Sequence, residues 1–410
     1  MLKFIFKEDI TMTFETLTPN GARICAPDMH GKMSEEFVPF AVRGPNFIEL
    51  NDGTLIYFFG MKFGSQLDEA LGCSAILRSH DGGKTWGEMR LLRYDGAPFD
   101  VNGGLPVYDK VHDTLILVAR TRHWKPGFEE DRLLSEGDQI KGHAYERFWM
   151  IKSNDGGLTW GEYKEVTIEG TPETWTIQHT MTPGVGLQLS KQKDPSKNGR
   201  LVIPSNRASL NNGENEFRAH LVISDDFGET WRVGALENYL GANESVAVEL
   251  NDGTIVYNCR NQGGTPENRR IQSISHDGGE TLEGSATVDT LFDPICHAGF
   301  ANATINGKEY IFFTAPSGEL GGVFKAFGTP QRWGRREALM MYASSDGGKT
   351  YKAIKQVSEK GVFAAYSAIC PTREGKLLCA WESGPEIGLY RDIRYTVFEL
   401  SELAALCDKA

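Results

Sequence analysis

The stretch SHDGGKTW, at residues 79–86, decides the fold because the chain repeats its pattern four more times. The further copies are SNDGGLTW at 153–160, SDDFGETW at 224–231, SHDGGETL at 275–282 and SSDGGKTY at 344–351. An Asp carboxylate can accept hydrogen bonds from backbone groups a residue or two further on, and Gly supplies the positive φ of a tight turn. Each copy therefore predicts a β-hairpin whose last residue, usually aromatic, packs into the neighbouring layer.

The spacing of the copies predicts a repeat array. They begin about 50 to 75 residues apart, which suits one small antiparallel sheet per repeat. A second repeat supports this interpretation, because FIELNDGTLIY at 47–57 matches AVELNDGTIVY at 247–257. Adding a last sheet at 362–400, which has no such turn, predicts an all-β, six-bladed β-propeller with five hairpins of this kind.

A closed array is a single structural unit, so we expect one domain despite the length of 410 residues. We expect residues 1–35 to be an N-terminal segment that contributes a ring-closing strand, at 11–18. This strand would pair with the last blade and remove the exposed sheet edges. Residues 36–400 form the propeller in this prediction, and residues 401–410 form a C-terminal tail. Long insertions at 124–141 and 315–333 interrupt two blades, and insertions of this length are usually functional or disordered.

Composition narrows the classes of partner and site. The net charge of −12 argues against nucleic acid as a partner, since nucleic-acid binding needs a basic surface. The seven cysteines are scattered and odd in number, so we expect buried thiols rather than a disulfide framework or a metal site. We expect no cofactor. The apolar run at the N-terminus is too short for a signal peptide, and no stretch is long enough to span a membrane, so the sequence predicts a cytoplasmic protein.

The five repeats are Asp-boxes (BNR repeats), and the chain resembles the sialidase (neuraminidase) superfamily of β-propellers over roughly residues 40–400. Asp-boxes also occur in propellers with other activities, so they indicate architecture and not chemistry. The resemblance implies that ligands bind at the mouth of the central channel. It also implies that the boxes lie on the outer rim, away from that mouth.

The resemblance implies three arginines that grip a substrate carboxylate, because planar, permanently charged guanidinium groups match an ionised carboxylate taken from water. Arg43 stands in RGP where the family usually has Arg-Ile-Pro, and Arg260 resembles the second arginine. Arg336, eight residues ahead of the fifth box, resembles the third, with Arg335 as a rival that the spacing disfavours.

The nucleophile of this family is a tyrosine instead of the usual carboxylate. A neutral phenol can approach an anomeric carbon that bears a carboxylate, whereas a charged Asp or Glu would be repelled. Tyr366, in AAYSA at 364–368, matches this nucleophile. Glu244, in GANES at 241–245, matches the glutamate that takes its proton.

A general acid must protonate the leaving oxygen, which requires a raised pKa. Asp68 lies in the loop where the family has this acid, and Glu69 is its competitor. Many relatives carry a further arginine just ahead of the acid, whereas here Lys62 is the one cation of residues 60–64. This departure concerns recognition of the sugar, and a close relative of sialic acid would suit Lys62 better. Three further loop residues are candidate recognition groups: Asp100, Asn102 and Trp124.

The resemblance thus implies an exo-acting retaining sialidase that forms a Tyr-linked glycosyl-enzyme and acts on glycans ending in sialic acid. Two alternatives stay open. The same mechanism could act on the glycoside of another nine-carbon 2-keto acid sugar. The chain could also be a carbohydrate-binding propeller that cleaves nothing, although the joint presence of a candidate acid, base and nucleophile argues against it.

Overall fold

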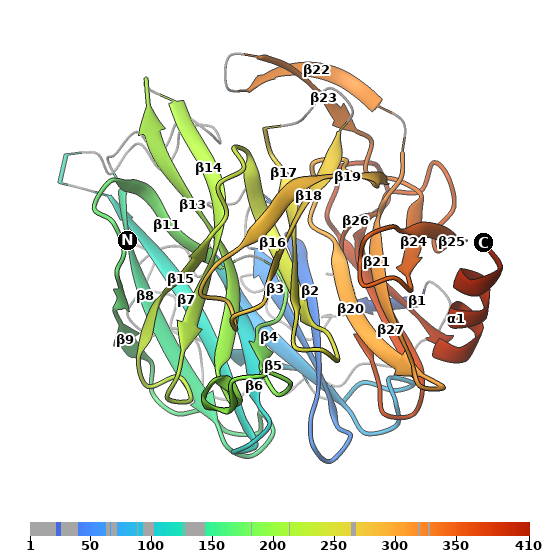
Figure 1. Ribbon diagram of the computed structural model, residues 1–410, viewed down its shortest axis with the longest axis horizontal. Helices are drawn as coiled ribbons and strands as arrows, with labels where there is room; N and C mark the ends of the chain where they lie inside the picture. The colour runs from blue at the N-terminus through green and yellow to red at the C-terminus, as the bar shows by residue number, and fades with distance from the viewer. Residues whose placement is uncertain are drawn as a thin grey trace.

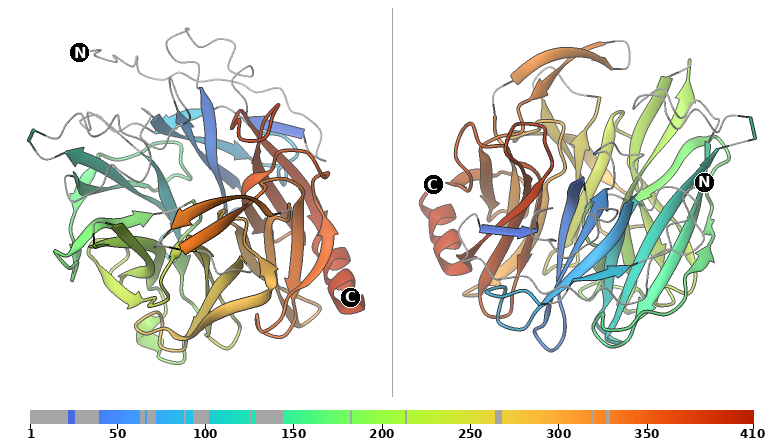
Figure 2. Two further views of the ribbon diagram at one scale, coloured as in Figure 1. Left: turned by 90° about the horizontal axis from the view of Figure 1, so that it is seen from above. Right: turned by 180° about the vertical axis from the view of Figure 1, so that it is seen from behind.

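The computed structural model describes residues 22–25, 40–62, 66, 72–87, 89–92, 102–124, 126–127, 144–181, 183–212, 214–263, 268–318, 320–326 and 329–410. Apart from a C-terminal helix and one short 3-10 helix, the regular secondary structure of these residues is β-strand, and the strands form six mainly antiparallel blades. Seen from above, the blades are arranged around a common centre (Figure 2, left). The predicted six-bladed β-propeller is therefore confirmed.

The strands follow the chain around the ring (Figure 1). Blade one consists of β2 (Ala41–Glu49), β3 (Leu55–Lys62), β4 (Gly72–Ser79) and β5 (Arg90–Leu92). Blade two consists of β6 (Asn102–Asp109), β7 (Thr114–Trp124), β8 (Ala144–Ser153) and β9 (Lys164–Val166). Blade three consists of β11 (Trp175–Met181), β13 (Leu201–Asn211), β14 (Glu214–Ser224) and β15 (Trp231–Leu236), flanked by β10 (Ile168–Glu169) and β12 (Leu187–Gln188).

The second half repeats this plan. Blade four consists of β16 (Ala242–Glu249), β17 (Ile255–Asn261), β18 (Arg269–Ser275) and β19 (Glu283–Phe292). Blade five consists of β20 (Gly299–Ile305), β21 (Lys308–Pro316), β24 (Leu339–Ser344) and β25 (Lys352–Gln356), with the hairpin β22 (Leu320–Ala326) and β23 (Thr329–Gly334) inserted. Blade six consists of β26 (Ala365–Pro371), β27 (Lys376–Ser383), β28 (Asp392–Glu399) and β1 (Ala22–Cys25).

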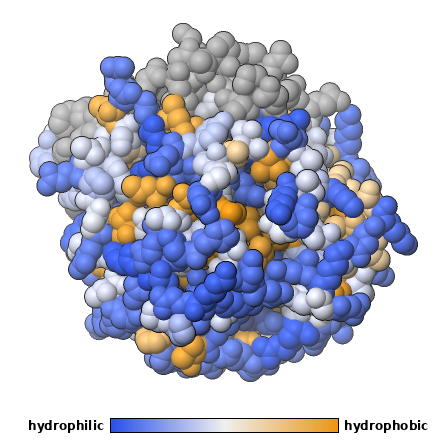
Figure 3. All heavy atoms as spheres, in the orientation of Figure 1, coloured by the Kyte–Doolittle hydropathy of each residue, from blue (hydrophilic) through white to orange (hydrophobic). Residues whose placement is uncertain are grey.

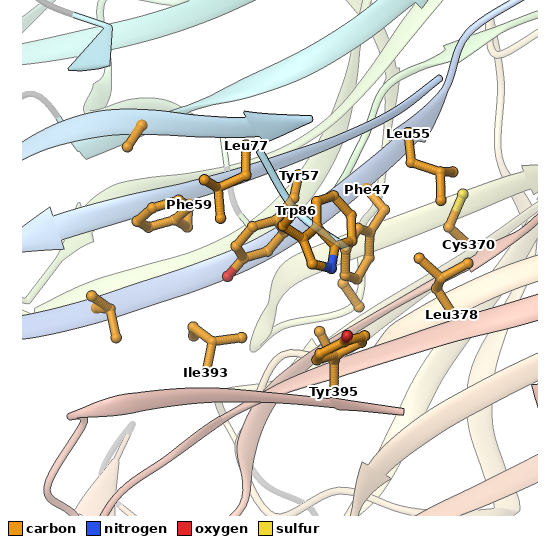
Figure 4. Close-up of a cluster of buried hydrophobic side chains, with 14 of the residues drawn as sticks. Phe47, Leu55, Tyr57, Phe59, Leu77, Trp86, Cys370, Leu378, Ile393 and Tyr395 are labelled. Atoms are coloured by element: carbon orange, nitrogen blue, oxygen red, sulfur yellow. The ribbon is translucent and has the colours of Figure 1, made fainter. Parts of the chain in front are cut away.

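The core is divided among the spaces between blades, because each sheet has apolar side chains on both faces. Six buried apolar clusters each join two neighbouring blades. Between blades six and one, Trp86 from the first Asp-box packs beside Phe47 and edge-on against Tyr395 (Figure 4). On the side of the ring drawn in Figure 3, hydrophilic side chains cover most of the surface.

All five Asp-boxes form the same hydrogen-bonded turn between the third and fourth strands of blades one to five. In the first, Asp81 accepts hydrogen bonds from the Ser79 hydroxyl at 2.8 Å, from the Thr85 amide at 2.9 Å and from the Thr85 hydroxyl at 2.6 Å. Gly83 has a φ of 84°, which favours glycine. The predicted hairpins are confirmed, but the carboxylate bonds to a residue four positions on, further than we expected. The equivalent aspartates are Asp155, Asp226, Asp277 and Asp346.

The ring closes through β1, which pairs antiparallel with β28 and aligns Ala22 with Tyr395. The described closing strand falls at 22–25, whereas the expected position at 11–18 lies outside the described residues. Residues 401–409 of the expected C-terminal tail lie in helix α1 (Leu400–Lys409). Its apolar residues recur every three or four positions, and Leu403 and Cys407 are buried in the cluster between blades five and six. Among the described residues, no helix has the length and apolar character needed to cross a membrane.

Candidate functional site

Five of the predicted site residues lie at one end of the ring. Within an antiparallel blade, the first and third strands begin at the end where the second strand finishes. Arg43, Glu244 and Tyr366 lie near the starts of the first strands β2, β16 and β26. Arg260 lies near the end of the second strand β17, and Arg336 lies just before the third strand β24. The Asp-boxes follow third strands and therefore lie at the opposite end, as the resemblance implied.

Tyr366, Glu244 and Arg260 form a closed set of hydrogen bonds. The Tyr366 hydroxyl donates to Oε1 of Glu244 at 2.6 Å. Nη1 of Arg260 donates to Oε2 of Glu244 and to the Tyr366 oxygen, both at 2.8 Å. Blades four and six thus place a phenol, a proton acceptor and a fixed positive charge in direct contact.

Two further arginines converge on the same tyrosine. The guanidinium carbons of Arg43 and Arg336 lie 5.1 Å and 5.3 Å from the ring centre of Tyr366. Tyr390 links these two arginines, because Arg43 lies 4.0 Å over its ring and Nη1 of Arg336 donates to its hydroxyl at 2.6 Å. Three guanidinium groups from blades one, four and five therefore surround one phenol.

Glu382, near the end of β27, holds Arg43 in place. Its Oε1 accepts from Nε of Arg43 at 2.8 Å and from the Gly44 amide at 2.7 Å. Gly44 has a φ of 63° at an irregularity in the pairing of β2 with β3. A β-branched residue is strained in this left-handed conformation, so the backbone here suits Gly44. Sequence reasoning missed Glu382 and Tyr390, and their one signal is their place at the site end of blade six.

The charges of the set fix its protonation. Burial would raise the pKa of Glu244, but the Arg260 charge and the hydrogen bonds from Tyr366 and Arg260 outweigh it and hold this pKa below its usual value. Burial and the Glu244 charge raise the pKa of Tyr366 well above its usual value, against the opposing effect of the arginines. At neutral pH the set is therefore a neutral phenol hydrogen-bonded to a carboxylate. The site can transfer the phenol proton to Glu244 when the phenol oxygen reacts.

The structure separates Arg336 from its rival. Arg335 is 55% exposed and lies 3.9 Å from Glu337, whereas Arg336 is largely buried and donates to the Ile295 carbonyl at 2.7 Å and to Tyr390. Arg336 is thus the member of this pair that belongs to the arginine cluster around Tyr366.

The remaining predicted residues are placed less completely. Asp68, its competitor Glu69, and Asp100 lie outside the described residues. Lys62 is the last residue of β3 and is buried, and Asn102 and Trp124 are the first residue of β6 and the last of β7. Gln66, two positions before Asp68, accepts a hydrogen bond from Nη1 of Arg43 at 3.5 Å through its carbonyl.

Comparison with known proteins agrees with the fold. Residues 74–379 match the BNR repeat-like domain family. The chain belongs to this BNR repeat-like family of the sialidase superfamily. Among its curated relatives, this BNR-repeat propeller is 29% identical to a sialidase of Micromonospora viridifaciens over 345 residues, which are 83% of this chain and 48% of the relative. It is 26% identical to a sialidase of Paraclostridium sordellii over 293 residues, which are 68% of each chain. The chain therefore spans about half the length of the first relative and two thirds of the second.

Solved structures show the same architecture as this BNR-repeat propeller. The Hadza microbial sialidase Hz136 superposes with a TM-score of 0.67 at 22% identity, over 88% of this chain and 66% of that chain. The intramolecular trans-sialidase of Ruminococcus gnavus, in complex with oseltamivir carboxylate, gives a TM-score of 0.64 at 19% identity, over 88% of this chain and 95% of that chain. At these identities the likeness concerns the fold alone.

Proposed function

We propose that the protein is an exo-acting retaining sialidase that removes terminal sialic acid from glycoconjugates. The observation that carries this proposal is the surroundings of Tyr366. Its hydroxyl is hydrogen-bonded to both Glu244 and Arg260, and the guanidinium groups of Arg43 and Arg336 lie over its ring. The sialidases among its relatives support the same activity.

Charge balance supports an anionic substrate. The site contains three guanidinium groups, whereas the carboxyl groups among its described residues are those of Glu244 and Glu382. Burial raises the pKa of Glu382, against the opposing effect of Arg43, so its negative charge is the costlier of the two. A substrate carboxylate would compensate the remaining positive charge. We propose that Arg43, Arg260 and Arg336 together bind that carboxylate.

The reaction begins with nucleophilic attack by Tyr366. Glu244 takes the phenol proton while the phenol oxygen bonds to the anomeric carbon and the glycosidic bond breaks. Asp68 would donate a proton to the departing oxygen. Water then attacks the anomeric carbon and gives a proton to the Asp68 carboxylate, while the bond to Tyr366 breaks and Glu244 returns its proton to the phenol oxygen. Two inversions retain the configuration. The raised pKa of Tyr366 makes Glu244 necessary, because the free phenolate would be costly at neutral pH.

The rest of the sugar would be recognised by Lys62 and Asp100. A buried ammonium at Lys62 can donate to hydroxyl groups that a planar guanidinium would bind differently. Turnover of another nine-carbon 2-keto acid glycoside, with none of sialosides, would keep the mechanism and change the sugar.

The test combines turnover with trapping. We expect wild-type protein to hydrolyse an aryl α-sialoside, and Tyr366→Phe to lower kcat by at least about 10³-fold because it removes the attacking oxygen. After incubation with 2,3-difluorosialic acid, mass spectrometry of a digest should find the sugar on the peptide containing Tyr366. Tyr310→Phe is the matched control, since the Tyr310 hydroxyl donates to Asp408 of helix α1 on the outside of blade five, and it should keep wild-type kcat. Sugar binding with no turnover over long incubation would instead identify a binding propeller.

A further inference from the structure

The segment 293–297, between β19 and β20, has an unusual backbone beside the site. Ile295 has a φ of 57°, a conformation that a β-branched residue rarely adopts and that must be held by its surroundings. Asp293, Ile295 and Cys296 are fully buried, and His297 is nearly so. This strained segment is therefore part of the packed interior and not an exposed loop.

Three consecutive residues of the segment, 295–297, contact Arg336 or Tyr366. The Ile295 carbonyl accepts from Nη2 of Arg336 at 2.7 Å. The Cys296 sulfur accepts from the Tyr366 amide at 3.3 Å, and the His297 ring stacks on the Tyr366 ring with centres 5.9 Å apart. The placement of Arg336 and Tyr366 thus depends on the conformation of this segment.

One buried carboxylate fixes that conformation. Oδ1 of Asp293 accepts from the amides of Ile295 at 2.7 Å and Cys296 at 3.3 Å. Its Oδ2 accepts from the amide of Asn261 at 2.6 Å, and Asn261 directly follows Arg260. Asp293 therefore joins the backbone beside Arg260 to the segment that holds the other two groups.

Arg270, on β18, forms further hydrogen bonds to this segment. Its Nη1 donates to the Cys296 carbonyl at 2.9 Å and to Asp293 at 3.3 Å, and its Nε donates to Asn258 at 2.8 Å. Both members of this ion pair are fully buried. A buried ion pair contributes little to stability, because the cost of desolvation offsets the attraction. The main effect of this pair is therefore to hold the backbone of residues 293–297 in place.

We propose that Asp293 and Arg270 are positioning residues that set the relative placement of Arg260, Arg336 and Tyr366 without touching substrate. The inference rests on the proposed function, in which these three groups bind the carboxylate and attack the sugar. Displacement of a reacting group by about 1 Å can lower a rate about a hundredfold.

The test is Asp293→Asn, which puts an NH₂ group against backbone N–H donors and should shift the segment. We expect kcat for an aryl sialoside to fall roughly tenfold to a hundredfold and KM to rise severalfold. Glu249→Gln is the matched control. Glu249 is another buried carboxylate, and it accepts hydrogen bonds from the backbone amides of Ser190 and Lys191. It lies five residues after Glu244, at the end of β16 away from the site. Both variants should lower Tm, and the control should keep kcat and KM within twofold of wild type.

A second variant and a second measurement keep the inference falsifiable. Arg270→Lys keeps the charge but cannot make all three bonds, so it should change kcat and KM in the same direction to a smaller extent, and it decides the matter if Asp293→Asn does not fold. Amide hydrogen exchange at 295–297 and at Tyr366 should be faster in either variant. A variant with lower Tm but unchanged kcat, KM and exchange at these amides would overturn the inference. If wild-type protein turns over no sialoside, the proposed function fails, and the exchange rates still decide whether Asp293 and Arg270 position the segment.

Discussion

The guanidinium of Arg260 bridges the proposed base and the proposed nucleophile. Its Nη1 contacts both the Glu244 carboxylate and the Tyr366 oxygen. We predict that Arg260→Lys raises KM for a sialoside by about tenfold or more, because an ammonium is a point charge without the planar fork that fits a carboxylate. Steady-state kinetics with an aryl sialoside measures this change.

Arg147→Lys is the control for that substitution. Arg147 pairs with Glu165 and is 42% exposed, and exchanging such a surface pair costs little. Its KM should match that of wild type. An Arg260→Lys enzyme with unchanged KM would remove Arg260 from the carboxylate-binding set.

Buried histidines make stability depend on pH. Burial, assisted by the charge of Arg207, lowers the pKa of His179 to about 3 from its ordinary value of 6.5. Between about pH 3 and pH 6.5, His179 is therefore protonated in the unfolded chain and neutral in the folded protein. The stability associated with neutral His179 is complete above about pH 6.5 and is lost as pH falls toward 3, at about 1.4 kcal/mol per pH unit.

We predict that His179→Asn makes the free energy of unfolding less dependent on pH between 5 and 6.5, by roughly 1 kcal/mol per pH unit. Asn suits the site, because His179 has a φ of 39° and its Nδ1 contacts His220 at 2.8 Å. Urea denaturation at several pH values measures the slope. His276→Gln, an exposed histidine, should keep the wild-type slope, and an equal slope in all three proteins would refute the prediction.

How much of the site the sequence predicts depends on the residue. Arg43, Arg260, Arg336, Glu244 and Tyr366 carry a family pattern, and the structure brings their side chains together. Their catalytic roles stay predictions. Glu382, Tyr390 and Asp293 were not predicted, because a single Glu, Tyr or Asp near a strand end has no distinctive pattern. Only the folded chain shows which polar groups meet.

Among the elements, the Asp-boxes were the most predictable, because each is stabilised within eight consecutive residues. We predict that Asp277→Ala lowers the free energy of unfolding by about 1–3 kcal/mol, since it leaves the Thr281 amide and the hydroxyl groups of Ser275 and Thr281 without their acceptor. The value of kcat should not change, because this turn lies at the end of blade four opposite the site. Urea denaturation and an activity assay measure the two effects.

Asp289→Ala is the control within the same blade. Asp289 is exposed on β19, so its loss should change stability by less than about 0.5 kcal/mol. Equal destabilisation by both substitutions would mean that the box hydrogen bonds contribute nothing beyond an ordinary surface aspartate.

Elements that depend on distant partners were harder to predict. Helix α1 was expected as a tail, because ten residues give a weak helical pattern until the apolar cluster between blades five and six provides a surface for Leu403 and Cys407. The closing strand expected at 11–18 stays a prediction, because that stretch lies outside the described residues. The strand that the structure describes, at 22–25, takes its position from the edge of β28.

For the whole molecule, the sequence predicted the six blades well, because the repeated Asp-box motif indicates one blade per repeat and this inference depends on no single contact. Closure of the ring gives a testable consequence. We predict that removal of residues 1–25 lowers Tm by several degrees and promotes aggregation, because β28 then becomes an exposed edge strand. Thermal unfolding and size-exclusion chromatography measure both effects.

Removal of residues 1–21, which keeps β1, is the control for that truncation. It should lower Tm less and leave the elution profile closer to that of the full chain. If both truncated proteins have the same Tm and the same elution volume, pairing of β1 with β28 does not stabilise the ring.

The contact of Arg43 with Glu382 and Tyr390 joins blade one to blade six, so the site crosses the seam where the two ends of the array meet. A ribosome makes blade one before blade six, because the blades follow one another along the chain. Several hundred residues separate Arg43 from Glu382 and Tyr390, so during translation Arg43 emerges long before the two residues that contact it. The proposed glycan cleavage therefore requires the closed ring, because a chain translated only as far as blade five lacks Glu382 and Tyr390 beside Arg43.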